Sequence, residues 1–182
     1  MAIRFAHARA LLKNGRIDQA VPRLEEVLAE TDTADVRNWL GIAYARQGRF
    51  DDAVRTFRAM VAAHPDSMAG RCNLATALAD AGQTAEAEAA WRDVLLRKPD
   101  HPDAHIKLAN LLRHLGRRDE AIAVHQERLA LKPDDAGSLN ALGILLEEAG
   151  RLVDAEQAYR EARKHAPDAP DIVNNLGVAL GK

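Results

Sequence analysis

The fold of this 182-residue chain is decided by residues 40–65, which read LGIAYARQGRFDDAVRTFRAMVAAHP. Apolar side chains recur here three and four positions apart, at Leu40, Ala43 and Tyr44 and again at Ala53, Val54 and Phe57. This spacing predicts two amphipathic helices. Gly48 separates the two helices, because glycine readily adopts the left-handed conformation that ends a helix. Pro65 follows the second helix, because proline cannot continue a helix.

The same markers return along the chain with a period of 33 or 34 residues. The glycines are Gly15, Gly48, Gly82, Gly116 and Gly150; an alanine follows each five residues later, and a Pro-Asp pair follows the last four glycines, at Pro65, Pro99, Pro133 and Pro167. Seven residues before each glycine stands another small residue, where we expect the paired helices to approach most closely: Ala8, Gly41, Ala75, Ala109 and Gly143, with Gly177 in phase. A period of this length predicts stacked structural repeats.

These markers resemble the tetratricopeptide repeat, whose pattern reads W-x2-L-G-x2-Y, then G, A-x3-F and P. The second repeat carries Leu40-Gly41-x-x-Tyr44, Gly48, Ala53-x3-Phe57 and Pro65; the third carries Leu74-Ala75, Leu78, Gly82, Ala87-x3-Trp91 and Pro99; the fifth carries Leu142-Gly143, Leu146, Gly150, Ala155-x3-Tyr159 and Pro167. The fourth repeat departs at His125, where an aromatic residue is usual. The first has Asp32 in place of the last proline, and Pro22 early in its second helix.

The resemblance covers the whole chain and implies an all-α, right-handed superhelical solenoid of antiparallel helix pairs. We expect a single array over residues 1–182, with repeats at 1–33, 34–67, 68–101, 102–135 and 136–169 and the first helix of a sixth at 170–182. That last helix presents Ile172, Val173, Leu176 and Leu180, some of which should remain exposed. Either the chain is a piece of a longer array, or this end docks onto another molecule.

Composition excludes several classes of function. Charged residues make up 29% of the chain but the net charge is only −2, which disfavours nucleic acid as a partner. The single cysteine, Cys72, allows no intrachain disulfide and favours a reducing, cytoplasmic location. No apolar run approaches the ~18 residues of a membrane helix, and no signal-peptide pattern is present, so we expect no membrane insertion.

In the resembled family, the first helices line a concave groove that binds another protein or a peptide. Carried over by register, the candidate groove residues are Asn38, Trp39, Asn73, Lys107, Asn110, Arg113, His114 and Asn140. An asparagine amide both donates and accepts, so it can pair with the backbone of an extended peptide. The sixth position of successive repeats reads Trp39, Asn73, Lys107, Ala141 and Asn175, so an asparagine ladder is broken. Alternatively, the asparagines are ordinary solvated residues on the helix surface.

Two further groups have alternative interpretations. Lys107, Arg113 and His114 form a basic patch that could receive a carboxylate. Alternatively, Lys107 and Arg113 are solvated charges or pair with Asp80 and Asp103. Trp39 either faces the groove, where it is a candidate hot spot for binding, or packs sideways against Phe5 or Cys72 and has a structural role.

Other site chemistry is not supported. The clamp with which chaperone-binding relatives hold a C-terminal carboxylate is matched outright only by Asn73. No phosphate loop, zincin motif or nucleophile elbow occurs, and His101 and His105 do not suffice for zinc. We therefore expect a protein-binding scaffold that is not an enzyme and has no catalytic residue, metal or cofactor. The alternatives are a scaffold that self-assembles through its C-terminal helix, as a homo-oligomer, and the substrate-recruiting region of a larger enzyme.

Overall fold

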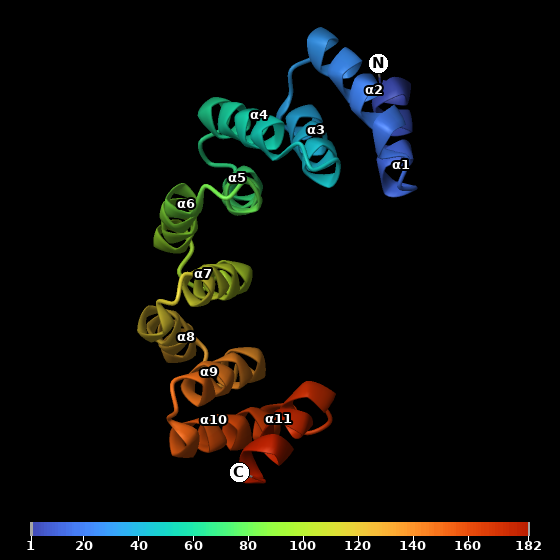
Figure 1. The fold of residues 1–182 in the computed structure, drawn as a ribbon. Coiled ribbons are helices and arrows are strands. Elements are labelled where there is room, and N and C mark those ends of the chain that lie inside the picture. The colour runs from blue at the N-terminus through green and yellow to red at the C-terminus, as the bar shows by residue number, and fades with distance from the viewer. Residues whose placement is uncertain (1, 182) are drawn as a thin grey trace. The chain divides into compact units, whose positions relative to one another are not determined.

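The computed structural model describes residues 2–181; Met1 and Lys182, the ends of the expected array, lie outside the described residues. The described residues form α-helices and no strand (Figure 1). The helices are α1 (Ala2–Lys13), α2 (Ile17–Glu30), α3 (Ala34–Arg46), α4 (Phe50–Ala63), α5 (Met68–Asp80), α6 (Thr84–Arg97), α7 (Pro102–His114), α8 (Arg118–Leu131), α9 (Ala136–Glu148), α10 (Leu152–His165) and α11 (Pro170–Leu180). None of these helices has the length and apolar character that crossing a bilayer requires.

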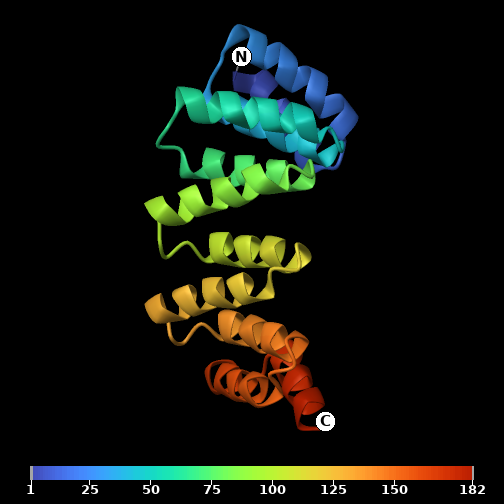
Figure 2. The ribbon, with the colours of Figure 1, turned by 60° about the vertical axis from the view of Figure 1, so that its left-hand side comes forward.

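The helices belong to two compact units, unit 1 (Met1–Val94) and unit 2 (Leu95–Lys182). In unit 1, each helix from α1 to α4 packs against the next along the chain, and α3 also contacts α1 and α5. In unit 2, α7 to α11 pack in the same sequential way, and Figures 1 and 2 both show α9, α10 and α11 side by side. The all-α fold of repeated helix pairs is confirmed, whereas the organisation as one array stays a prediction.

The turn within each helix pair contains a glycine in the left-handed conformation, as the sequence predicted. The φ angles of Gly15, Gly48, Gly82, Gly116 and Gly150 lie between 73° and 76°. A Cβ atom is unfavourable in this conformation, which explains the choice of glycine. The prolines at 65, 99, 133 and 167 each stand two residues beyond the end of a second helix, where their missing N–H breaks no helical hydrogen bond.

Four of the first helices begin with a side-chain cap that the sequence analysis missed. Thr33, Ser67, His101 and Asp135 each accept a hydrogen bond from the backbone N–H three residues later, at 3.1–3.3 Å. Such a cap satisfies one of the free N–H groups at a helix start. The four residues are spaced one repeat apart, so the caps fix the start of each first helix in the same register.

The small residue seven positions before the turn marks the close helix contact, as expected, at two glycines. A Cβ added at Gly41 would lie 2.5 Å from Phe57 Cζ, and one added at Gly143 would lie 2.5 Å from Tyr159 Cε1. The ring of each second helix therefore packs directly onto the backbone of its first helix. Gly177 is in phase, but a Cβ there would meet no described atom within 4 Å, because no second helix packs on this side of α11.

This difference predicts opposite effects for one substitution at two in-phase positions. Gly143→Ala should lower the free energy of unfolding by about 1–2 kcal/mol, because overpacking against Tyr159 outweighs the gain in helix propensity. Gly177→Ala should leave stability unchanged or raise it by up to about 1 kcal/mol. Urea unfolding followed by circular dichroism measures both. Equal effects of the two substitutions would contradict the assigned contact.

Candidate functional site

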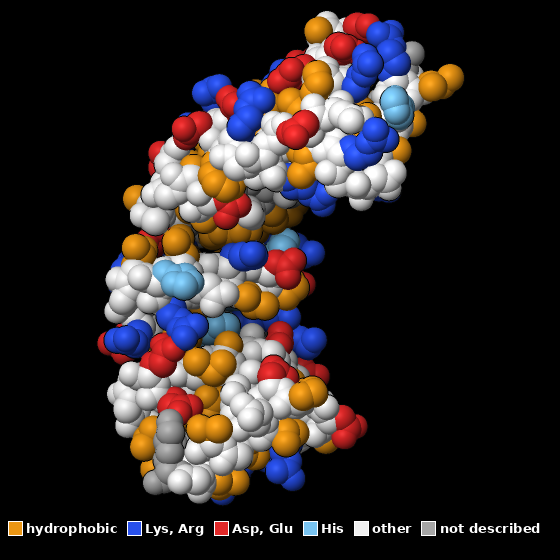
Figure 3. Space-filling view, turned by 45° about the vertical axis from the view of Figure 1, so that its right-hand side comes forward, with side chains coloured by type: hydrophobic (Ala, Val, Ile, Leu, Met, Phe, Trp, Pro, Cys, Tyr) orange, Lys and Arg blue, Asp and Glu red, His pale blue; other side chains and the backbone are white. Residues whose placement is uncertain are grey.

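The eight candidate residues all lie on first helices of the pairs. We call the surface formed by α1, α3 and α5 the first-helix face of unit 1, and that formed by α7, α9 and α11 the first-helix face of unit 2. Side chains of both charge signs are interspersed over the surface shown in Figure 3. The chemistry of each face is therefore set by local groups of residues.

Trp39 is half-buried on α3, and its ring is covered by cations from α1. The Arg9 guanidinium lies 4.8 Å from the centroid of the Trp39 ring and 5.5 Å from that of Phe5, so it is placed between the two rings. The Lys13 ammonium lies 5.9 Å from the Trp39 ring. Within residues 2–181, neither cation has a carboxylate partner. Cation–π attraction thus holds two uncompensated positive charges beside an aromatic ring.

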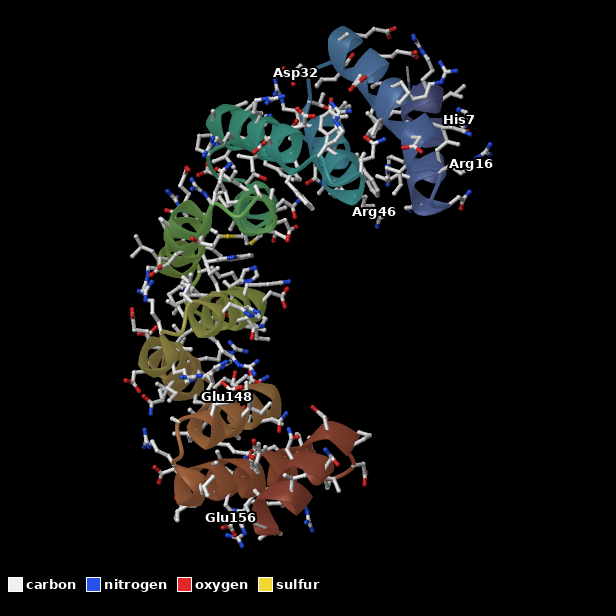
Figure 4. All side chains as sticks on the ribbon, in the orientation of Figure 1. His7, Arg16, Asp32, Arg46, Glu148 and Glu156 are labelled. Carbon is white, nitrogen blue, oxygen red and sulfur yellow. The ribbon has the colours of Figure 1, made fainter. Side chains whose placement is uncertain are left out.

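A surface hollow of about 250 Å³ lies on the same face of unit 1, between α3 and α5. Ile42, Thr76 and the ring of Phe57 are among the side chains that line it, and Arg46 and Asp80 give it two charged groups. Arg46 projects from the end of α3 and donates a hydrogen bond to the carbonyl of Leu12 at 3.1 Å (Figure 4). Trp39, Ile42 and Arg46 are three and four residues apart, so they form one stripe along α3.

The candidate asparagines form two hydrogen-bonded pairs between neighbouring first helices. Asn73 Nδ2 donates to Asn38 Oδ1 at 2.6 Å in unit 1, and Asn175 Nδ2 donates to Asn140 Oδ1 at 3.0 Å in unit 2. Asn140 also donates to Asp171 at 3.3 Å and is only 8% exposed. The amides of Asn38 and Asn73 remain half-buried at the surface, whereas Asn140 is largely occupied within the protein.

The predicted basic patch on α7 carries less free charge than the sequence suggested. Lys107, Asn110 and His114 are exposed, but Arg113 pairs with Glu148 of α9, its Nε lying 3.0 Å from Oε1. Figure 4 shows Glu148 on α9. This pair raises the pKa of Arg113 and lowers that of Glu148, each mainly through the shared hydrogen bonds. The expectation that Arg113 is solvated or pairs with Asp80 or Asp103 is therefore wrong.

A cavity of about 70 Å³ lies between α7, α8 and α9 in unit 2. It is lined by Ala109, Asn110, Arg113, His125, Ala141, Ile144 and Leu145. His125 replaces the usual aromatic residue and is 2% exposed; among the described residues, its Nδ1 has no hydrogen-bond partner. Burial lowers the pKa of His125 to about 4, with a smaller effect from nearby His105, so the imidazole is neutral at pH 7.

The sequence analysis did not select Arg9, Lys13 or His125 for the site. His125 had a signal, because it is a polar residue at a core position of the repeat. The contacts between repeats had none: Asn38–Asn73, Asn140–Asn175 and Arg113–Glu148 are each 35 residues apart, one more than the period, and this offset is known only from the structure. Arg9 and Lys13 also had a signal, because they are in phase with Ile42 and Arg46 of the second repeat.

Comparison with solved structures gives broad similarity in fold. TTC0263, a thermophilic TPR protein of Thermus thermophilus, is 24% identical, with a TM-score of 0.66 over 100% of this chain and 99% of its own. A MamA protein, MamA AMB-1, is 27% identical, with a TM-score of 0.68 and full coverage of both chains. A tetratricopeptide repeat protein of Parabacteroides merdae ATCC 43184 is 15% identical, with a TM-score of 0.81 over 99% of this chain and 72% of its own.

No curated protein matches the sequence. The family model for the tetratricopeptide repeat matches residues 5–67, 72–136, 124–170 and 140–180. This family implies protein partners and is usually non-catalytic. The matched segments and the repeated helix pairs show that the chain belongs to the tetratricopeptide repeat family.

Proposed function

We propose that the chain is a scaffold that binds a segment of another protein along its first-helix faces. The observation that carries this proposal is the group formed by Trp39, Arg9 and Lys13 beside the hollow of about 250 Å³ in unit 1. A half-buried tryptophan next to an apolar hollow is a typical anchor point for a partner side chain. The two cations favour a segment that carries a carboxylate near its apolar anchor.

The asparagine pair beside this hollow supports an extended conformation of the bound segment. The bond between Asn38 and Asn73 uses one amide hydrogen and one carbonyl oxygen lone pair, so each amide keeps donor and acceptor capacity. A peptide backbone presents the matching groups whatever its sequence. The pair therefore supplies affinity, whereas Trp39 and the neighbouring cations supply selectivity.

Affinity capture from a lysate of the source cell tests this function. The native chain should retain a partner that a Trp39→Ala, Lys107→Glu double variant loses by at least tenfold, because truncating a hot-spot tryptophan alone removes about 2 kcal/mol or more. The two single variants assign the loss to the first-helix face of unit 1 or of unit 2. Far-ultraviolet circular dichroism verifies that each variant keeps its helical content.

A matched control carries similar changes on a second helix. Val153 and Lys164 are both exposed on α10, so Val153→Ala, Lys164→Glu alters hydrophobicity and charge away from both first-helix faces. This control should retain the partner. If the double variant and the control capture the same proteins in the same amounts, the placement of the binding surface on the first helices is wrong.

The exposed apolar side of α11 favours self-assembly as a second candidate function. Val173, Val178 and Leu180 are 45%, 48% and 56% exposed, and hydrophobic side chains are visible in the C-terminal part of Figure 3. In a repeat protein, such a surface ordinarily packs against the next helix. If the captured species is a second copy of this chain, and Val178→Glu abolishes its capture, self-assembly replaces binding of a different protein.

A further inference from the structure

We propose that the hollow between α3 and α5 in unit 1 binds a segment whose apolar anchor stands between an acidic and a basic residue, and that Asp80 selects the basic one. This inference rests on the proposed function, because it assumes that an extended segment lies along the first-helix face of unit 1. It adds a basic side chain, and the order of the two charges, to the acidic residue and apolar anchor proposed above. Three features support it: the unpaired charge of Asp80, the cations on the opposite side of the hollow, and the apolar surface between them.

Asp80 carries an uncompensated negative charge at the edge of the hollow. It is exposed in the last turn of α5. Within residues 2–181, no cation or hydrogen-bond donor pairs with its carboxylate. A carboxylate is unfavourable at this place, because the C-terminal end of a helix itself carries partial negative charge. A cation supplied by a partner would offset both charges.

The equivalent carboxylate in unit 2 is neutralised by the protein itself. Glu148 occupies in α9 the position that Asp80 occupies in α5, and Arg113 of α7 pairs with it, the Arg113 Nε lying 3.0 Å from Glu148 Oε1. In unit 1, the position equivalent to Arg113 is Ala45 of α3, which has no charge. The carboxylate of Glu148 is therefore occupied, whereas that of Asp80 is available to a cation of the bound segment.

The cations near the hollow are held on its α1 side. Arg46 lines the hollow, but its NH1 donates to the Leu12 carbonyl at 3.1 Å, so its guanidinium is tied to α1 (Figure 4). Lys13 follows Leu12 on α1, and its ammonium lies 5.9 Å from the Trp39 ring. An acidic residue of the segment would pair with these cations, and a basic residue would pair with Asp80 on α5. The separation of the two sides fixes the order of the two charges.

The surface between the two charged sides favours an apolar side chain. The uncharged residues that line the hollow are Ile42, Ala45, Phe57, Asn73, Thr76 and Ala77. Asn73 already donates to Asn38 at 2.6 Å, and the Thr76 hydroxyl donates to the Cys72 carbonyl at 2.9 Å. The other four side chains are apolar. An aliphatic or aromatic side chain therefore fits the hollow, since it brings no polar group that needs a partner there.

The extended conformation sets the spacing of the three residues. In an extended chain, alternate side chains point to the same face and lie about 7 Å apart. The side chains that face the protein are therefore two residues apart in the segment. The expected pattern is acid-x-apolar-x-base, or its reverse when the segment runs in the opposite direction.

A random twelve-residue peptide library displayed on phage tests the inference on the full chain. The wild type, the charge reversal Asp80→Lys and the matched control Asp134→Lys are panned in parallel; Asp134 is exposed in the turn between α8 and α9, away from both first-helix faces. Peptides selected by the wild type and by the control should carry the acid-x-apolar-x-base pattern in one direction. Those selected by Asp80→Lys should keep the acidic and apolar residues and lack the basic one.

The folded state is not at risk in the test variant. A lysine in the last turn of a helix is favourable, so Asp80→Lys should keep the helical content of the wild type by circular dichroism. Asp80→Asn removes the charge without reversing it and should give a weaker preference for the basic residue than the wild type. An unchanged preference in a folded Asp80→Lys chain would show that the basic residue pairs elsewhere and would overturn the inference.

The best wild-type peptide is then synthesised with its basic residue and with glutamate in that place. At low ionic strength, the change to glutamate should weaken binding to the wild type and to Asp134→Lys about fivefold, because an attraction becomes a repulsion. The same change should strengthen binding to Asp80→Lys about fivefold, because the repulsion becomes an attraction. Equal effects on all three chains would overturn the inference.

Binding of this peptide to Trp39→Ala separates failure of the inference from failure of the proposed function. If Trp39→Ala weakens binding at least tenfold but the selected peptides show no preference for a basic residue, the inference fails while the proposed function stands. If neither Trp39→Ala nor Asp80→Lys changes binding, or if no chain selects any peptide, both fail.

Discussion

Replacing Arg128 by alanine should lower the free energy of unfolding by about 2–3 kcal/mol, because it leaves a partly buried carboxylate without its partner. Arg128 is 6% exposed on α8. Its Nε donates to Asp135 Oδ2 at 2.9 Å, and its NH1 donates to the carbonyl of Asp100 at 2.8 Å. Asp135 caps α9 and Asp100 lies just before α7, so one guanidinium ties α8 to the starts of both neighbouring first helices.

The hydrogen bonds around Asp135 lower the pKa of its carboxyl group. Burial alone would raise that pKa, but the hydrogen bonds from the Ser138 N–H and from Arg128 outweigh burial and hold it below its usual value. Removing Arg128 eliminates a charged donor and leaves the desolvation cost in place. The loss should therefore exceed that of any exposed ion pair in the same unit.

Urea unfolding of Arg128→Ala and of Arg160→Ala measures the difference. Arg160 pairs with Glu156 on α10, but its side chain is 55% exposed, so its removal should cost less than about 0.5 kcal/mol. An Asp135→Asn variant completes a double-mutant cycle, since asparagine can still cap α9 but has no charge. A cost for Arg128→Ala equal to that for Arg160→Ala would show that the pair of Arg128 and Asp135 contributes no more to folding than an exposed ion pair.

The backbone features of this protein were predictable because each depends on one residue type in a fixed local setting. Glycine at φ near +75° and proline after a helix end are properties of single positions. Repetition every 34 residues made them visible. The close contacts at Gly41 and Gly143 were predictable for the same reason, since a backbone approach excludes a Cβ atom wherever it occurs.

The candidate site was only partly predictable, because its chemistry depends on long side chains from neighbouring repeats. Register placed Trp39, Asn73 and Asn110 on first helices but could not show that Arg9 covers the Trp39 ring or that Glu148 neutralises Arg113. Such contacts depend on side-chain rotamers and on the offset between stacked helices. The common spacing of 35 residues expresses that offset, and it is visible only after the pairs are known.

His125 should make the stability of this chain fall as the pH is lowered from 6.5 to 4. Its pKa is about 4 in the folded protein, because burial and the neighbouring His105 disfavour the charged ring, although Asp135 acts in the opposite direction. In the unfolded chain, the ordinary value of about 6.5 applies. Between pH 6.5 and 4 the unfolded state binds the proton and the folded state does not, so stability falls as the pH is lowered.

The size of this effect follows from the difference between the two pKa values. Each pH unit inside the window costs about 1.4 kcal/mol, so the wild type should lose about 2.5 kcal/mol from His125 between pH 7 and pH 4.5. Above pH 6.5 the ring is neutral in both states and contributes no pH dependence. The carboxyl groups whose pKa values are lowered, among them Asp135 and Glu148, lose their stabilising contribution as the pH falls below about 4.5, so most of their effect comes at a more acidic pH.

His125→Phe should remove this loss, because phenylalanine has no titratable group and is the kind of residue that stands at the equivalent position as Phe57. Urea unfolding at pH 7 and at pH 4.5 gives the change in stability for the wild type, for His125→Phe and for the exposed control His165→Phe. Because the comparison is between two pH values of the same chain, any stabilisation by the larger ring at both values cancels. The control should follow the wild type, and His125→Phe should lose about 2.5 kcal/mol less. If all three chains lose the same amount, the pKa of His125 in the folded protein equals its value in the unfolded chain, and burial of this imidazole does not make the stability depend on pH.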